Sequence, residues 1–262
     1  MKTKIIIATH KEKSLVHNDI FLPVQVNSEK SGYTIDPNYI LDNTLENISE
    51  KNYTYNELTA LYWAWKNLED FDIFGLMHYR RYLDIHYKKK LFKKESIDII
   101  DSVKKDSIKL KKVFDTTQTN KTVEKLLTDF DILLPRPAVC SVNGIISPIA
   151  TDYKHNHISA DWDICMDVIR EKFPEYNSSI EQYLEKGSLF YIGNMFVAKR
   201  KTMEEYCNWL FAVLFETEKR ITFSEDPYQR RVIGFLSERL FTLYILHNKF
   251  KLKQLPILFV ES

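Results

Sequence analysis

The sequence contains very little glycine. Only 6 of its 262 residues are glycine, and they form no Walker A loop, no GxGxxG turn after a strand and no GxSxG elbow. Glycine-rich loops bind phosphate through backbone N–H groups, because a residue without Cβ lets the backbone approach the ligand closely. Any phosphate bound by this protein is therefore expected to be held largely by side chains.

Cysteine, net charge and long apolar runs are also scarce. The three cysteines are widely spaced and form no CxxC pair, which argues against a disulfide framework or structural zinc and favours a reducing cytoplasm. A net charge of +1 and the lack of a recognisable module argue against a nucleic-acid partner. The first apolar run is too short for a signal peptide, and no run approaches the roughly 20 residues of a membrane-spanning helix. We expect a cytoplasmic protein.

Strand-like and helix-like segments alternate along the chain. KIIIAT (4–9) and DIFGLMH (72–78) are typical of buried strands, and Thr54 and Glu57 match a capping box that would open a helix over residues 54–70. This order favours an α/β fold, in which ligands collect at the carboxyl ends of strands. Further strands are predicted in FLPVQV, FDILLP, LFYIGNMFVAK and LPILFV, and further helices over residues 159–176, 202–220 and 226–248.

Two segments interrupt this alternation. Residues 86–125 are rich in lysine, and we interpret them as a helical insertion in a single domain of residues 1–262. Its helices are either simply solvated or present a basic face to anionic lipid or to a polyphosphate-lipid carrier, which would place the protein at the inner side of the membrane. Residues 136–157 are predicted to form a long functional loop.

The stretch HYRRYLD (78–84) follows the second buried strand. Side chains alternate across an extended segment, so Arg80 and Arg81 are expected to point in opposite directions. One arginine would bind a planar anion or a phosphate, and the other would brace the strand end. The alternative is an arginine-rich strand end on a solvated edge.

Arg239 lies near the middle of the apolar stripe of the helix predicted over residues 226–248. A buried guanidinium needs carboxylate or phosphate partners, because an isolated one is strongly disfavoured. Glu238 should project to the flank of the helix, so it is not the expected partner. Arg239 would belong either to a binding site or to a structural salt bridge.

Several longer stretches carry a resemblance to a known family. ENISEKNYTYNELTALYWAWKNL, FGLMHYRRYLD, IGNMFVAKRKTMEEYCNWLFAVLFETEKR and RVIGFLSERL resemble the bacterial domain-of-unknown-function family found in capsular and exopolysaccharide loci, whose members are treated as glycosyltransferases. The resemblance implies a GT-A-like glycosyltransferase fold: a single Rossmann-like domain with a mixed sheet flanked by helices and a helical C-terminal part. It also implies a nucleotide-sugar donor, with a UDP-linked galactose or galactofuranose favoured, and a saccharide or lipid-linked acceptor.

The same resemblance suggests how a donor diphosphate is held. GT-A enzymes carry an Asp-x-Asp motif for a divalent cation after the second of these strands, whereas this chain has HYRRYLD there. Asp84 is the remaining carboxylate and would be a weak ligand, with His78, for Mn²⁺ or Mg²⁺. The resemblance therefore predicts that Arg80 or Arg81 offsets the diphosphate charge and that no cation is obligatory.

The resemblance also implies roles for residues elsewhere. The donor-binding set would be Thr9, His10, Lys51, Asn52, His78, Tyr79, Arg80, Arg81, Tyr82 and Arg239. The acceptor would contact His157 and Asn194, and the general base would be Glu238, Asp152 or Asp161. Glu57 is assigned to the helix cap and not to catalysis. The rival interpretation is a non-catalytic sugar-nucleotide-binding or scaffold protein of a polysaccharide assembly complex, which the missing Asp-x-Asp favours.

Overall fold

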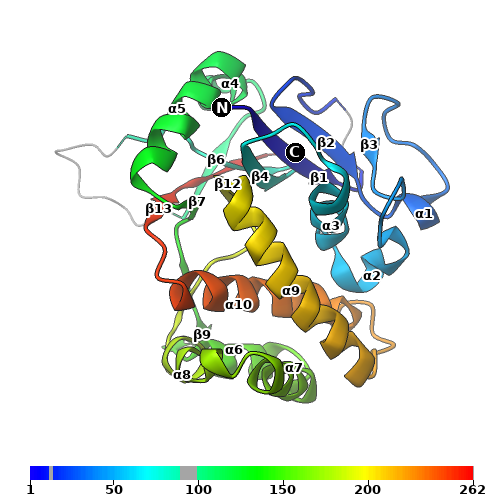
Figure 1. Ribbon diagram of the computed structural model, residues 1–262, viewed down its shortest axis with the longest axis vertical. Helices are drawn as coiled ribbons and strands as arrows, with labels where there is room; N and C mark the ends of the chain where they lie inside the picture. The colour runs from blue at the N-terminus through cyan, green and yellow to red at the C-terminus, as the bar shows by residue number, and fades with distance from the viewer. Residues whose placement is uncertain (12–13, 89–98, 262) are drawn as a thin grey trace.

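The computed structural model describes residues 1–11, 14–88 and 99–261, and a mixed β-sheet runs through its centre (Figure 1). The order of the main strands is β13-β7-β12-β4-β1-β2-β3. β1 is parallel to β2 and β4, whereas β12 is antiparallel to β4 and β7. The bounds are β1 Thr3–Thr9, β2 Phe21–Gln25, β3 Ile40–Leu41, β4 Ile73–His78, β7 Ile132–Pro135, β12 Phe196–Lys199 and β13 Leu252–Leu255.

Shorter strands extend this sheet and form two small ribbons. β5 pairs with β4 and β14, and β14 pairs with β6. β8 pairs with β11, and β9 pairs with β10. The bounds are β5 Arg81–Leu83, β6 Ile100–Val103, β8 Ala138–Val139, β9 Ser141–Val142, β10 Ile145–Ile146, β11 Leu189–Phe190 and β14 Ile257–Val260.

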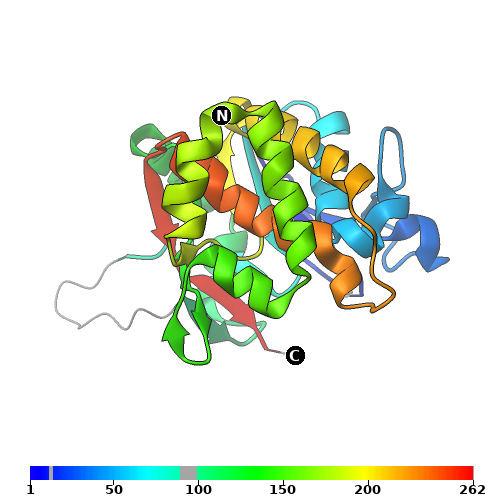
Figure 2. The same ribbon diagram turned by 90° about the horizontal axis from the view of Figure 1, so that it is seen from below.

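Helices cover both faces of the sheet. In Figures 1 and 2, α9 and α10 lie beneath the sheet with α6, α7 and α8 beyond them, while α4 and α5 lie apart beside the N-terminus. The bounds are α1 Ser28–Ser31, α2 Asn52–Tyr55, α3 Leu58–Asn67, α4 Ile108–Phe114, α5 Thr116–Asp129, α6 Ile149–Asn156, α7 Ser159–Lys172, α8 Asn177–Ser179, α9 Arg200–Arg220 and α10 Val232–His247. Shorter helical turns are η1 Ser49–Lys51, η2 Pro174–Tyr176, η3 Ile180–Glu185 and η4 Gln229–Arg231.

The alternation of side chains along β1 divides the core in two. Ile6 packs into the larger cluster, with α3, α9 and α10, and Ile5 packs into the smaller one, with α4 and α5. Gly75 in β4 lies where a Cβ would come within 3.0 Å of side-chain carbons of Ile5 and Val197, so the close packing of the sheet requires glycine there. Both faces of β1 are buried, as its continuous β-branched run predicts.

The predicted helix over residues 54–70 is wrong in its first turn. α2 ends at Tyr55, Asn56 takes a left-handed φ of 51°, and α3 begins at Leu58. The Thr54 hydroxyl donates a hydrogen bond to the Lys51 carbonyl. Glu57 occupies the N-cap position of α3, but its carboxylate accepts no hydrogen bond from the backbone of that helix. No capping box forms, so the carboxylate of Glu57 is available for another contact.

Two other predicted segments are more structured than expected. Residues 136–157 are not one long loop, because they hold β8, β9, β10 and the whole of α6. The lysine-rich segment 86–125 is not purely helical, because it includes strand β6 as well as α4 and part of α5. Its residues 89–98 lie outside the described part. Over residues 1–11, 14–88 and 99–261 we find no helix with the length and hydropathy needed to span a bilayer.

Candidate active site

A cavity of about 480 Å³ opens at the carboxyl ends of β1 and β4. The chain runs from β1 to β2 and β3 on one side, then returns to place β4 on the other side of β1. Such a reversal of strand order leaves a crevice outside the strand ends, which is where ligands bind in open α/β sheets. Thr9 and His78 end the two strands and line the cavity, and His10 and Tyr79 follow them.

The opposite wall comes from the start of α10 and from the break between α2 and α3. Gly234 of α10 lies where a Cβ would come 2.0 Å from Nδ2 of Asn56, so glycine allows these two segments to approach each other. Asn56 Oδ1 accepts a hydrogen bond of 3.0 Å from Arg231 Nε. The break at Asn56, which the sequence did not predict, therefore positions one of the two arginines that line this cavity.

The cavity brings two basic and two acidic side chains together. Arg81 and Arg231 line it with Glu57 and Glu238. Within the described residues the Arg81 guanidinium forms no hydrogen bond and no ion pair. Burial, Lys11 and Arg231 lower the pKa of His10, so that imidazole is neutral near pH 7. The Arg81 and Arg231 guanidinium groups bring positive charge to the cavity.

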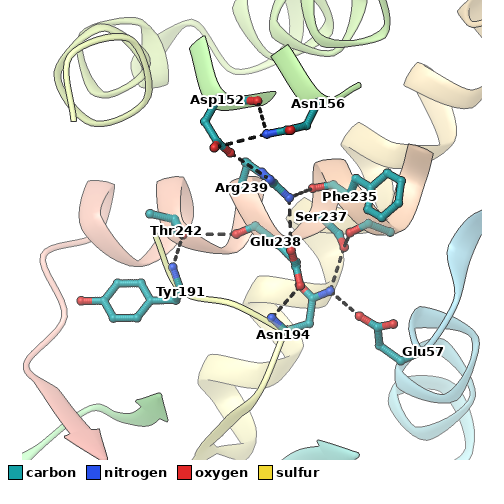
Figure 3. Close-up of polar contacts among 12 residues, drawn as sticks. Glu57, Asp152, Asn156, Tyr191, Asn194, Phe235, Ser237, Glu238, Arg239 and Thr242 are labelled. Atoms are coloured by element: carbon teal, nitrogen blue, oxygen red, sulfur yellow. Dashed lines mark hydrogen bonds and ion pairs between the residues drawn. The ribbon is translucent and has the colours of Figure 1, made fainter. Parts of the chain in front are cut away.

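Glu238 is held on both of its carboxylate oxygens (Figure 3). Oε1 accepts from the backbone N–H of Gly193 at 2.7 Å, and Oε2 accepts from Arg239 Nη1 at 3.1 Å. Burial raises the pKa of this carboxyl, and Arg239 is the largest opposing influence. The side chain keeps 23% of its surface exposed, so Glu238 is a fixed carboxylate that still reaches the cavity.

Arg239 lies behind Glu238 and is buried, with carboxylate partners, as its position in the apolar stripe predicted. Its side chain is 7% exposed and its Nη2 lies 3.5 Å from Asp152 Oδ2. The expectation that Glu238 would not pair with it is wrong, because adjacent side chains on α10 bend toward each other (Figure 3). Arg239 does not line the cavity, and its contacts are with Glu238, Asp152 and the Phe235 carbonyl. Its predicted role in donor binding stays a prediction.

Glu57 is positioned by a residue far away in the sequence. Asn194 donates through Nδ2 to Glu57 Oε1 at 2.8 Å and to Ser237 Oγ at 2.9 Å (Figure 3). Gly193 and Asn194 have φ of 78° and 52°, and this left-handed pair breaks the predicted strand between β11 and β12. His78 Nε2 contacts the Gly193 carbonyl at 2.6 Å, which ties the same turn to the end of β4.

The two arginines of HYRRYLD separate at the turn between β4 and β5. Arg81 lines the cavity beside Glu238, whereas Arg80 donates through Nε to the Val260 carbonyl at 3.3 Å and lies over the Phe259 ring. The two arginines line different cavities, as predicted, although Tyr79 and Arg80 form a turn and not the extended segment that the prediction assumed. The role of either arginine in ligand binding stays a prediction. Tyr82 is 2% exposed and lines a second cavity, to which Tyr79 also contributes.

The remaining predicted donor and metal residues lie in different places. Asn52 lines the cavity, but Lys51 does not, and its ammonium pairs with Glu218 at 2.8 Å. Asp84 is 6% exposed outside the cavity, and burial raises the pKa of its carboxyl. Among residues 1–11, 14–88 and 99–261, no group of three or more His, Cys, Asp or Glu side chains is placed to hold a metal ion.

The remaining predicted acceptor and base residues lie outside the lining of the cavity. The His157 ring stacks on Phe235 at 4.1 Å, and burial, with Arg239 nearby, lowers its pKa to about 4. Asn194 is 1% exposed, Asp152 faces Arg239, and burial raises the pKa of the Asp161 carboxyl on α7. None of the four lines the cavity. Sequence reasoning missed Arg231 and discounted Glu57, since neither position carries a local signal of a site.

Comparison with known proteins agrees with this architecture. The family model described as a domain of unknown function (DUF4422) matches residues 4–249. The solved apo structure of WbbM, a bifunctional glycosyltransferase, matches with a TM-score of 0.88 and 30% sequence identity, over 100% of this chain and 46% of that one.

The chain thus spans less than half the length of that protein. A search of curated proteins found no match. The likeness in structure confirms the expected GT-A-like α/β fold, with a mixed sheet flanked by helices. The chain belongs to the domain-of-unknown-function family DUF4422.

Proposed function

We propose that this protein is a glycosyltransferase that moves a sugar from a nucleoside diphosphate sugar to a saccharide or lipid-linked acceptor. The donor is a UDP-sugar, with galactose or galactofuranose favoured, and the pathway is capsule, exopolysaccharide or lipopolysaccharide synthesis on the cytoplasmic side of the membrane. The observation that carries the proposal is the joint presence of Arg81, Arg231, Glu57 and Glu238 at the strand-end cavity. The similarity to a bifunctional glycosyltransferase supports the reaction class.

The arginines suit the donor half of this reaction. When the bond between the sugar and the diphosphate breaks, negative charge grows on the leaving oxygen, and preorganised cationic donors stabilise it. Guanidinium groups bind phosphate oxygens in a bidentate manner and stay charged at every relevant pH. In the proposal Arg81 and Arg231 neutralise the diphosphate, and no reaction step depends on a cation at Asp84.

Glu238 suits the acceptor half. The acceptor oxygen attacks the anomeric carbon while its proton passes to the Glu238 carboxylate, and the nucleoside diphosphate leaves with the electrons of the broken bond. A pKa raised by burial makes a carboxylate a stronger base, which favours this proton transfer. Arg239 fixes the orientation of Glu238 and keeps it ionised, and Asp152 in turn holds Arg239. Glu57, on the same wall of the cavity, is available to bind sugar hydroxyls.

Binding and turnover of UDP-galactose test the proposal. Arg231→Ala should weaken UDP binding in calorimetry by about tenfold or more, since a charge-assisted hydrogen bond contributes roughly 1.5–3 kcal/mol. Arg230→Ala is the matched control, because Arg230 is exposed and does not line the cavity. Glu238→Gln should keep UDP affinity and slow sugar transfer by roughly 10²–10⁴-fold.

Four results would contradict parts of this picture. Absence of UDP binding would reject the donor site, and equal losses in Arg231→Ala and Arg230→Ala would reject its location. Complete loss of transfer in excess EDTA with recovery on adding Mn²⁺ would show that arginines do not replace a cation. Tight UDP binding without transfer to any saccharide or lipid-linked acceptor would favour the non-catalytic sugar-nucleotide-binding protein.

A further inference from the structure

A second and larger cavity, of about 970 Å³, lies on the other side of the turn between β4 and β5. Helix α4 and strand β14 contribute to its walls, and much of its lining is apolar. The apolar lining residues are Leu15, Val16, Tyr82, Leu110, Phe114 and Val260. Tyr82 packs edge-on against Phe114 with ring centroids 5.0 Å apart, so this apolar wall is a fixed part of the core.

Basic side chains surround this apolar wall. Lys11, Arg80, Lys105 and Lys111 line the cavity, against two acidic residues, Asp115 and Glu261. The Asp115 carboxylate already caps α5, because its Oδ1 accepts from the Gln118 N–H at 2.9 Å. Arg80 uses Nε for the Val260 carbonyl, and within the described residues its two terminal nitrogens have no hydrogen-bond partner. The cavity therefore combines an apolar surface with an excess of positive charge.

Tyr79 connects the two cavities. It lines both, and its ring meets the edge of His10, which lines the first cavity, at a centroid distance of 5.3 Å. The next two residues continue this division, since Arg80 lines the second cavity and Arg81 the first. A ligand anchored near Arg80 would therefore reach the first cavity by passing one aromatic side chain.

We infer that the second cavity binds the phosphate and the adjoining hydrocarbon of a lipid-linked acceptor, an assignment that rests on the proposed transferase function. The phosphate lies at Arg80 and Lys111, the hydrocarbon covers Leu110 and Phe114, and the sugar extends past Tyr79 toward Glu238. An inorganic phosphate would leave the apolar wall uncovered, and a neutral lipid would leave Arg80 and Lys111 without a counterion. Only an amphipathic anion matches both surfaces.

Farnesyl phosphate is a probe of this chemistry, and its binding to the full chain can be measured by calorimetry below its aggregation limit. We expect binding that Lys111→Glu weakens by about tenfold or more, because an attractive charge becomes a repulsive one. Lys112→Glu makes the same change one residue along α4 but outside the cavity, and should leave the affinity within about twofold. Farnesol and inorganic phosphate should each bind at least about tenfold more weakly. Arg80→Gln provides a second variant if Lys111→Glu unfolds.

Several outcomes would overturn the inference. Equal affinity for farnesyl phosphate and farnesol would remove the role of the basic residues, and equal losses in Lys111→Glu and Lys112→Glu would place the site elsewhere. Binding to vesicles of anionic phospholipid without binding of farnesyl phosphate would indicate a membrane surface contact. UDP binding on the same sample separates the two proposals. UDP binding without farnesyl phosphate binding rejects only the acceptor site, and the reverse result rejects only the donor site.

Discussion

Removing Arg239 should destabilise the protein strongly, because the residue joins two carboxylates inside the fold. The side chains of Arg239, Glu238 and Asp152 are 7%, 23% and 14% exposed, so solvent screens their interactions weakly. Replacing Arg239 by methionine keeps most of the apolar volume but leaves both carboxylates without their cation. Breaking a buried ion pair in this way costs about 3 kcal/mol of unfolding free energy, which corresponds to a melting temperature lower by about 6 °C in a chain of this size.

The loss of unfolding free energy in Arg239→Met should also depend on pH, and it should be larger at higher pH. Burial raises the pKa of the Glu238 carboxyl and Arg239 lowers it, so Arg239→Met raises that pKa further. A carboxyl whose pKa is higher in the folded state than in the unfolded state binds more protons in the folded state. Such a carboxyl costs the folded state nothing below the pKa it has in the unfolded chain. It destabilises the folded state as the pH rises toward and through the pKa it has in the folded chain. The deficit of Arg239→Met should therefore be smaller near about pH 5 than near about pH 8.

Urea unfolding at these two pH values measures both effects. Lys201→Met is the matched control, because Lys201 and its partner Glu205 are 86% and 55% exposed on α9 and their contact should contribute less than about 0.5 kcal/mol. If Arg239→Met were as stable as the unmodified chain, the ion pairs would not stabilise the fold. A deficit of the same size at both pH values would show that Glu238 does not titrate as the geometry requires.

Three further predictions concern individual positions around the cavity. His157→Phe should flatten the dependence of unfolding free energy on pH between about 4 and 6.5, because a histidine whose pKa is lowered by burial destabilises the folded state when it becomes protonated. Urea unfolding across this range measures the effect, and an unchanged pH profile would contradict it. Gly234→Ala should weaken UDP binding in calorimetry more than it lowers the melting temperature, because its Cβ displaces the side-chain amide of Asn56; unchanged affinity would be the contrary result. Asn194→Ala should cost about 2 kcal/mol in urea unfolding, since it removes two hydrogen bonds and keeps a positive φ; Asn208→Ala, on the exposed face of α9, is its control.

Much of the sheet could be predicted from local sequence. The runs KIIIAT and DIFGLMH are rich in apolar and β-branched residues, and they form the adjacent strands β1 and β4. Because ligands collect at the carboxyl ends of such strands, the sequence also pointed to Thr9, His10, His78 and Tyr79, which line one cavity. The helical period placed Arg239 on an apolar stripe and so predicted a buried cation with carboxylate or phosphate partners, and the structure shows carboxylates.

Other elements could not be predicted from sequence because their conformation depends on distant contacts. Thr54 and Glu57 have the spacing of a capping box, but Asn194 binds Glu57 from 137 residues away and Asn56 turns left-handed against α10. Residues 149–156 lack a strong helical signal, and they form α6 where Asp152 meets Arg239. Local propensity is a weak prior, and tertiary packing overrides it at these positions.

The sequence by itself determined the main strands of the sheet, such as β1 and β4, and the apolar stripe of α10 that carries Arg239. Periodicity carries this information, because it depends only on the geometry of the backbone within one element. Only the tertiary structure decided that Arg81 faces Glu238 while Arg80 faces an apolar cavity, and that Arg231 and Glu57 join the first cavity. Those relations are set by packing between elements far apart in the chain, which no local pattern specifies.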